Sequence, residues 1–511
     1  MSQDATSTDQ PRPRLRSLAI KGMLWLSGQR IGGRILDQVF TIVMVRLLAP
    51  RDFGVLAMAV VFTGVLGLFT HSGISGAIVQ RKDVDDQYLS TAFWANVGIG
   101  VILMLVAMIA SRFVGLFMRE PLAGTVMVVL STRLLFDAAA STQAAWMSRH
   151  MNYRALSLRP LFATIVGGTL GVILAFRGFG VWSLVAQQVG SSAAGAAALY
   201  YAGGFRPRLT FSWQQFKDLW SFGGPLFLSR LFGYAVRNTD NLLVGRYLGS
   251  MALGFYALAY SVFLVPVVDI GFPMTQVMFS TLSRMQEDTD RLKRSFLLAT
   301  RYITMIALPM MVGLSLVAPL LVAIVFGARW LPAGTVMSVL ALAGFLQLMT
   351  ALGPSALQAM GRTDLHMRWA LLSVFLYLPA FAIGLRWGIL GVATGYLIAT
   401  MVLTPIQWGF VARVIGVTVR DLWTAVSPSV IGSVAMTALV LPARLVLIES
   451  AVPKVVTLTV LVLLGVAAYG GITWVTQRQA LIKLFRMLYE TRGERPVPRL
   501  HKAEESIGRT V

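Results

Sequence analysis

The chain has 511 residues, of which 56% are hydrophobic and 13% charged, with a net charge of +22. A soluble protein carries roughly 25% charged residues, so the composition excludes an ordinary soluble domain and predicts an all-α polytopic membrane protein. The basic balance would suggest nucleic acid in a polar chain, but the apolar content argues against that partner. The sequence has no cysteine and 4 histidines, which excludes disulfides and thiol catalysis and predicts no metal site.

Apolar segments of membrane-spanning length follow one another along the chain, and at about 20 residues per crossing they predict about 14 transmembrane helices. We predict these helices at 20–48, 54–79, 88–117, 122–147, 156–176, 179–201, 219–247, 253–281, 298–326, 333–360, 366–385, 388–412, 424–447 and 454–476. The predicted organisation is a disordered N-terminus (1–17), a six-helix N-lobe (18–201), a cytoplasmic linker (202–217), a six-helix C-lobe (218–412), an additional helix pair (413–476) and a basic amphipathic cytoplasmic tail (477–511).

The basic residues outside these helices predict the orientation. Most of them fall in the N-terminus, in alternate loops and in the C-terminal tail, all on one side of the membrane. Lysine and arginine accumulate in cytoplasmic loops. We therefore expect a multi-pass membrane protein with both termini in the cytoplasm.

An internal repeat relates the two lobes. Residues 48–59 align with 248–259, and the same offset pairs Arg30 with Arg230 and Gly54 with Gly254. Each lobe has an even number of helices, so the lobes must be parallel and related by an axis along the membrane normal. Two such lobes predict a central cavity between them and transport by alternating access.

Arginines inside the predicted helices indicate what this cavity binds. An arginine at the bilayer centre costs roughly 2.5–3.5 kcal/mol on insertion scales, so such residues face a cavity or a partner. The candidates for binding phosphate oxygens are Arg30, Arg34, Arg230 and Arg237. Arg34–Asp37 and Arg237–Asp240 could instead form internal ion pairs, whereas Arg30 and Arg230 have no carboxylate one turn away.

Other charged residues are candidates for a gate or for ion coupling: Asp37, Arg133, Asp137, Asp240 and Asp269. Arg133 and Asp137 form an i,i+4 pair that is either a gate or a satisfied pair of charges. Asp269 has no apparent cationic partner; it either carries a coupling proton or bonds backbone groups freed by neighbouring prolines. We expect Arg46, Arg112, Arg246 and Arg301, near helix ends, to extend toward the membrane surface.

Several features of an enzyme are missing from the sequence. No loop is long enough for a soluble catalytic domain, and no Walker motif is present. The prediction is therefore a transporter rather than an enzyme.

The motifs Lys21-Gly-Met-Leu-Trp25, Leu47-Leu-Ala-Pro-Arg-Asp-Phe-Gly54 and Gly361-Arg-Thr-Asp364, with glycine-rich sixth and twelfth helices, carry a family resemblance. Over residues 18–412 the chain resembles the polysaccharide-transporter branch of the multidrug/oligosaccharidyl-lipid/polysaccharide (MOP) superfamily, and most of all its Wzx-type flippases. The match is one of pattern, repeat and length together.

The resemblance implies a flippase that moves an undecaprenyl-diphosphate-linked oligosaccharide from the cytoplasmic to the periplasmic leaflet. It implies no cofactor, coupling to an H⁺ or Na⁺ gradient, contact with membrane lipids, and cooperation with a polysaccharide polymerase and export machinery. In relatives, helices beyond the twelfth can form a lipid-binding groove. The alternatives are a cation-coupled multidrug exporter, a flippase for another isoprenoid-linked glycan such as the peptidoglycan precursor, and a non-transporting assembly scaffold.

Overall fold

The computed structural model describes residues 32–70, 76, 78, 81, 84–450 and 452–492, without the side chains of 218–230, 232, 236, 479–481 and 483–492. The described residues form helices and no strand, which confirms the predicted all-α fold. A helical segment at 32–47 precedes the labelled helices. These are α2 (Pro50–Thr70), α4 (Asp86–Phe117), α5 (Pro121–Arg149), α6 (Tyr153–Phe176), α7 (Val181–Ala202), α8 (Trp213–Leu248), α9 (Ser250–Pro266), η1 (Val267–Gly271), α10 (Phe272–Ser283), α11 (Thr289–Val325), η2 (Ala328–Trp330), α12 (Leu331–Thr350), α13 (Leu352–Ala359), α14 (Thr363–Gly384), η3 (Leu385–Trp387), α15 (Gly388–Ile415), α16 (Val419–Glu449) and α17 (Lys454–Arg492).

Ten of the described helical segments are long and apolar enough to cross a membrane, and one of them, Thr363–Ile415, contains both α14 and α15. Large apolar side chains stay exposed on the outer helices, including Ile109 and Val475, each 82% exposed. Such a surface is stable against hydrocarbon and would aggregate in water. The protein is an integral, multi-pass membrane protein.

Two helices that we predicted as continuous are interrupted. The segment predicted at 253–281 contains a π-helical turn, η1, bounded by Pro266 and Pro273, because each proline removes a backbone donor from the helix ladder. The segment predicted at 333–360 divides at Ala351 into α12 and α13. Pro354 cannot donate to the Thr350 carbonyl, and the Gln407 side chain donates to it instead at 3.2 Å.

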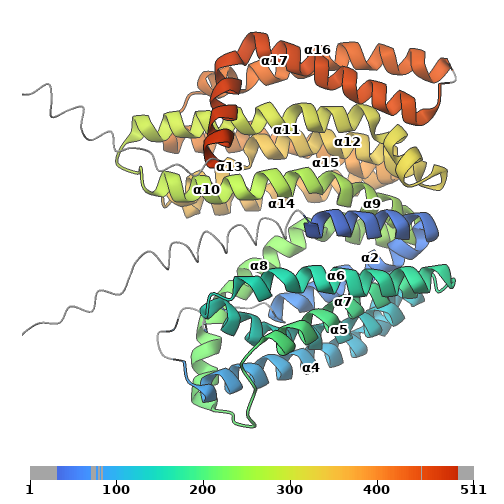
Figure 1. Cartoon of the computed structure of the whole chain (residues 1–511), viewed down its shortest axis with the longest axis vertical. Helices are drawn as coiled ribbons and strands as arrows, with labels where there is room; N and C mark the ends of the chain where they lie inside the picture. The colour runs from blue at the N-terminus through green and yellow to red at the C-terminus, as the bar shows by residue number, and fades with distance from the viewer. Residues whose placement is uncertain are drawn as a thin grey trace, which may run out of the picture.

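The helices form two halves joined by α8 (Figure 1). We call the segment 32–47 with α2–α7 the first half, and α8–α15 the second half, which begins with the connecting helix α8. Long helix α8 starts against the first half, where Thr91 donates to Gln215 at 3.1 Å, and runs obliquely toward α9. Helices α16 and α17 lie outermost and pack on α11, where Tyr469 donates to the Met305 carbonyl at 2.8 Å and Arg444 to the Leu316 carbonyl at 2.9 Å.

The two halves touch most closely where α2 and α9 cross. A Cβ atom on Gly54 would overlap the Ser250 carbonyl, and a Cβ atom on Gly254 would overlap the Pro50 carbonyl. We call these four residues the glycine crossing. Because Pro50 aligns with Ser250 and Gly54 with Gly254 in the internal repeat, each half presents the same surface to the other. The pseudo-twofold axis of the repeat therefore passes through this contact.

Further contacts between the halves surround the glycine crossing. Buried Trp330 donates from Nε1 to the Val45 carbonyl at 2.9 Å, and its ring packs edge-on against Phe53. Glu120 accepts from Ser250 at 3.0 Å and pairs with Arg51 at 3.1 Å. We call the end of the molecule that carries these contacts and the glycine crossing the sealed end.

Replacing either crossing glycine should weaken the sealed end. We expect Gly54→Ala and Gly254→Ala each to lower the free energy of unfolding by about 1–3 kcal/mol, as overpacking does in tight interiors. The decrease in the free energy of unfolding should be smaller for the double variant than the sum of the decreases for the two single variants, because the first methyl group already separates α2 from α9. Thermal unfolding in lipid nanodiscs measures these changes.

The matched control is Gly98→Ala in α4, where an added Cβ meets no atom within 4 Å. This change should be neutral or stabilising, because alanine is the better helix former. Equal melting temperatures for Gly54→Ala, Gly254→Ala and the control would contradict the close backbone approach.

Candidate functional site

Three of the predicted intramembrane arginines lie at one depth. Measured along their helices from the sealed end at 1.5 Å per residue, Arg34 lies about 20 Å deep, Arg133 about 18 Å and Arg237 about 17 Å. This depth is close to the middle of a hydrocarbon core about 30 Å thick. Arg30 lies outside the described residues, and Arg230 lies in α8 with its side chain not described.

Arg34 forms an ion pair between the two halves. Its Nη2 lies 2.8 Å from Oδ1 of Asp269 and its Nε lies 3.3 Å from Oδ2, a two-pronged geometry. The expectation that Asp269 has no cationic partner is therefore wrong. The pair links the segment 32–47 to the π-helical turn η1, and its side chains are 40% and 46% exposed. A pair this exposed contributes about 0–1 kcal/mol to stability, so it is easily opened.

The aspartates one turn from these arginines have other partners. Asp37 accepts a hydrogen bond from Thr164 of α6 at 3.1 Å. Asp240 is only 3% exposed and accepts from the Tyr256 hydroxyl at 2.8 Å. Neither of the internal pairs that we considered, Arg34–Asp37 and Arg237–Asp240, is an ion pair in the structure.

Among the described residues, Arg237 is therefore a cation without a paired anion. Its side chain is exposed, and no oxygen of the described residues accepts a hydrogen bond from it. Because an unpaired guanidinium at this depth is costly, Arg237 is the described residue best suited to bind an anionic ligand.

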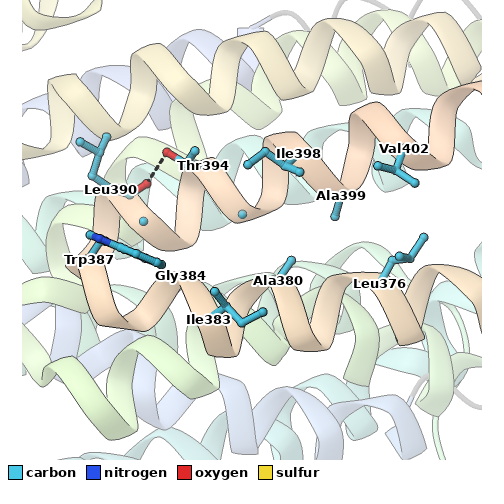
Figure 2. A pocket seen from close by; sticks show the side chains of 12 residues that line it. Leu376, Ala380, Ile383, Gly384, Trp387, Leu390, Thr394, Ile398, Ala399 and Val402 are labelled. Carbon is cyan, nitrogen blue, oxygen red and sulfur yellow. Dashed lines mark hydrogen bonds between the residues drawn. The ribbon is translucent and has the colours of Figure 1, made fainter.

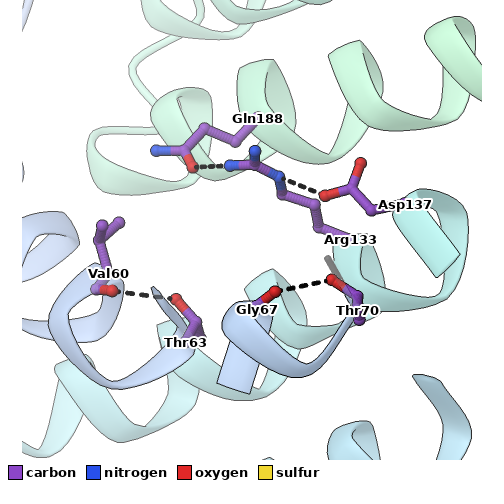
Figure 3. Close-up of polar contacts among 7 residues, drawn as sticks. All are labelled: Val60, Thr63, Gly67, Thr70, Arg133, Asp137 and Gln188. Atoms are coloured by element: carbon purple, nitrogen blue, oxygen red, sulfur yellow. Dashed lines mark hydrogen bonds and ion pairs between the residues drawn. The ribbon is translucent and has the colours of Figure 1, made fainter. Parts of the chain in front are cut away.

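Arg133 and Asp137 form the i,i+4 pair that the sequence predicted, and the structure adds a third member. Arg133 donates to Asp137 at 3.1 Å and to the side-chain oxygen of Gln188 at 3.1 Å (Figure 3). Gln188 lies on α7, and no sequence signal distinguished it from its neighbour Gln187. We call Arg133, Asp137 and Gln188 the N-half cluster.

The arginines near helix ends belong to the sealed end and to the outer helices. Arg46 donates to the Val325 and Ile324 carbonyls, at 2.8 and 2.6 Å, at the C-terminus of α11 in the other half. Its repeat partner Arg246 lies over the Phe117 ring, at the C-terminus of α4 in the first half. Both arginines therefore make structural contacts with the opposite half rather than extending to the membrane surface. Arg301 donates to Gln477 at 3.0 Å, and Arg112 is exposed.

Two apolar grooves open on the outer surface of the second half. One, of about 470 Å³, lies between α14 and α15 and is lined by Leu376, Ala380 and Trp387 (Figure 2). The other, of about 530 Å³, separates α11 and α12 from α16, with Phe345 and Val434 among its lining residues. Neither groove is lined by a charged side chain. Within the described ranges, no three His, Asp or Glu side chains gather in a way that could hold a metal ion.

The sequence has relatives in polysaccharide synthesis. Residues 43–335 match the family described as "Polysaccharide biosynthesis protein". The chain is 26% identical over 397 residues to the lipopolysaccharide biosynthesis protein WzxC of Escherichia coli, covering 77% of this chain and 81% of that one. It is 29% identical to the teichuronic acid biosynthesis protein TuaB of Bacillus subtilis, covering 65% and 69%. It is 26% identical to the succinoglycan biosynthesis transport protein ExoT of Rhizobium meliloti, covering 72% and 75%.

Solved structures share the fold at low sequence identity. The lipid II flippase MurJ in an inward closed conformation superimposes with a TM-score of 0.72 at 14% identity, over 90% of this chain and all of that one. An inward-facing multidrug transporter of the MOP superfamily gives a TM-score of 0.63 at 17% identity, over 75% and 94%. An outward-facing one gives 0.52 at 17% identity, over 78% and 96%. With more than half of its length matched, this chain belongs to the polysaccharide biosynthesis protein family, as a Wzx-type transporter with the fold of the MOP superfamily.

Proposed function

We propose that the protein moves an undecaprenyl-diphosphate-linked oligosaccharide repeat unit from the cytoplasmic to the periplasmic leaflet by alternating access. The observation that carries this proposal is that arginines from both halves lie near mid-membrane, and that one of them, Arg237, has no anionic partner among the described residues. The printed names of WzxC, TuaB and ExoT agree with a substrate on the route to a surface polysaccharide. ExoT is named as a transport protein.

The sealed end is the periplasmic end in this proposal, and the molecule faces the cytoplasm of a bacterial inner membrane. The distribution of lysine and arginine supports this orientation, with both termini in the cytoplasm. The higher TM-score to the inward-facing than to the outward-facing transporter supports an inward-facing state.

The diphosphate would bind first to Arg237. Guanidinium groups bind phosphate oxygens through two parallel hydrogen bonds, and within the described part of the chain no carboxylate would have to be displaced from Arg237. Arg34 becomes a second ligand when its exposed pair with Asp269 opens. Arg30 and Arg230 remain predicted ligands, since Arg30 lies four residues before Arg34 in the sequence and Arg230 lies two turns before Arg237 on α8.

The isoprenoid tail would stay outside the cavity, in the apolar groove between α11, α12 and α16. The groove's lining is almost entirely apolar, and Val434 on its edge is 63% exposed. An alkyl chain gains about 0.8 kcal/mol per buried CH₂ group. Membrane lipids occupy the same groove when no substrate is bound.

Ion coupling would use Asp240 rather than Asp269. Asp269 is already neutralised by Arg34, whereas Asp240 is buried with a tyrosine hydroxyl and a backbone amide as its partners. An ionised carboxylate in such surroundings is costly, so an arriving H⁺ or Na⁺ is stabilised there. The driving force in this proposal is a proton or sodium gradient, without a cofactor. A polysaccharide polymerase and export machinery would take up the product.

Transfer between leaflets of proteoliposomes tests the proposal. Labelled undecaprenyl-diphosphate oligosaccharide is supplied with and without a proton or sodium gradient, with a cationic dye as the control solute. We expect the lipid-linked sugar to cross and the dye to be excluded. Movement of the dye alone would instead identify a multidrug exporter, and transfer of only the peptidoglycan precursor would identify a different glycan flippase.

Removing the charge of Arg237 should weaken substrate binding. A hydrogen bond to a charged group contributes about 1.5–3 kcal/mol, so we expect Arg237→Gln to reduce transfer roughly 10- to 100-fold. Arg237→Lys should retain part of the activity, because it keeps the charge but loses the two-pronged geometry.

The control for this variant is Arg386→Gln, which removes an exposed arginine from η3, outside the cavity. Transfer by Arg386→Gln should match the wild-type rate. Wild-type transfer by Arg237→Gln would remove this arginine from the proposed site.

Locking the sealed end should stop transport. The chain contains no cysteine, so Glu120→Cys with Ser250→Cys creates a single reactive pair at an observed contact. We expect a short, reducible cross-linker to join the halves and abolish transfer, and reduction to restore it. Each single-cysteine variant, treated identically, should keep its activity. Full transfer by the cross-linked protein would contradict opening at this end.

A further inference from the structure

The N-half cluster has unused hydrogen-bonding capacity. A guanidinium carries five N–H donors, and within the described part of the chain Arg133 uses Nε for Asp137 and Nη1 for Gln188. The amide nitrogen of Gln188 has no acceptor there either. Arg133 is 45% exposed although it lies near mid-membrane. The cluster therefore presents free donors beside a carboxylate acceptor.

The wall of α2 facing the cluster offers it no partner. The hydroxyl of Thr63 donates to carbonyls of its own helix, at 3.0 Å to Ala59 and 3.5 Å to Val60, and that of Thr70 donates to the Gly67 carbonyl at 2.8 Å. Figure 3 shows the contacts with Val60 and Gly67. The free groups of the cluster consequently remain available to a ligand.

The cluster also lies at the level of the proposed diphosphate site. Arg133 is about 18 Å and Arg237 about 17 Å from the sealed end along their helices. Arg133 belongs to the first half and Arg237 to the second. Helix α5 packs on α2, and α2 in turn packs on α8 and α9 of the second half. Helix α2 therefore packs against both the helix that carries Arg133 and the helix that carries Arg237.

The two sites differ in charge, and this difference separates their ligands. Arg237 has no anionic partner in the described ranges, which suits a diphosphate. Arg133 is paired with Asp137, which also interacts electrostatically with Arg159 of α6, so a phosphate at the cluster would have to compete with a carboxylate 3.1 Å from Arg133. Sugar hydroxyls both donate and accept hydrogen bonds, and a guanidinium, an amide and a carboxylate in one cluster offer both kinds of partner.

We propose that Arg133, Asp137 and Gln188 form a subsite for the hydroxyl groups of the transported oligosaccharide, and that this subsite selects which glycan is carried. The inference rests on the proposed function and adds a second contact region to it. Selection follows because a glycan without a matching hydroxyl leaves polar groups of the cluster unpaired, which is strongly unfavourable.

The test compares two probes in proteoliposomes. One is the lipid-linked repeat unit extracted from the source bacterium, and the other is undecaprenyl diphosphate without sugar. Gln188→Met preserves the shape of the side chain but removes its amide. We expect this variant to raise the KM for the glycan-bearing probe about 3- to 10-fold, the effect of one or two hydrogen bonds, with the KM for the sugar-free probe unchanged.

The matched control is Gln187→Met, one position earlier on α7. Gln187 packs its Cβ and Cγ against Gly171 of α6 and makes no contact with Arg133. The Gln187→Met variant should leave the KM for both probes at the wild-type value. Asp137→Asn, which removes the acceptor charge, should shift preference in the same direction as Gln188→Met without changing the melting temperature by more than the control does.

The outcomes separate this inference from the function on which it rests. If the wild-type protein carries both probes and Gln188→Met affects them equally or not at all, the subsite is wrong and the flippase stands. If the wild-type protein transfers neither probe, the proposed function fails and the subsite with it. A loss confined to the glycan-bearing probe supports both.

Discussion

The backbone contact between α2 and α9 determines how the rest of the molecule is arranged. With glycines at positions 54 and 254, each helix presses on a carbonyl of the other, and no side chain separates them. That contact fixes the axis relating the two halves, and Trp330, Arg46 and Glu120 can bridge the halves only because the backbones lie so close. Because the molecule is closed at the sealed end, the mid-membrane arginines are accessible from the opposite end. A substrate on that side of the membrane can therefore reach them.

The intramembrane arginines are distinguished by their partners rather than by their positions. Arg46 binds helix-end carbonyls, Arg133 binds a carboxylate on its own helix, and Arg34 binds a carboxylate of the other half. Arg237 binds none of the described acceptors. The partners grade from carbonyls at the sealed end, through a carboxylate on the same helix and one in the other half, to no acceptor among the described residues at Arg237. Such a gradation is what a cavity needs if it must hold an anion briefly and then release it.

The sequence predicted the features that depend on local spacing. The repeat aligned Gly54 with Gly254, the apolar segments placed most helices, and the i,i+4 spacing of Arg133 and Asp137 gave a pair that the structure contains. Contacts between distant segments were not predictable in this way. Asp269 meets Arg34 only after the halves pack, and Gln188 differs from Gln187 only by its direction on α7. The π-helical turn η1 and the break before α13 follow from prolines, but proline alone does not reveal whether a helix bends or divides. Arg30 and Arg230, the strongest candidates from sequence, lie where the structure describes no side chain.

The outer helices α16 and α17 are attached to α11 along its whole length. Arg444 and Tyr469 bind carbonyls of α11, and Arg301 of α11 binds Gln477, a buried residue at the kink where α17 changes direction. The other end of α11 supplies the carbonyls that hold Arg46. When those carbonyls are released, α11 must carry α16 and α17 with it as one rigid piece. The groove between α11, α12 and α16 then keeps its width while its orientation in the membrane changes. A lipid tail bound there would tilt together with these helices and would not need to dissociate.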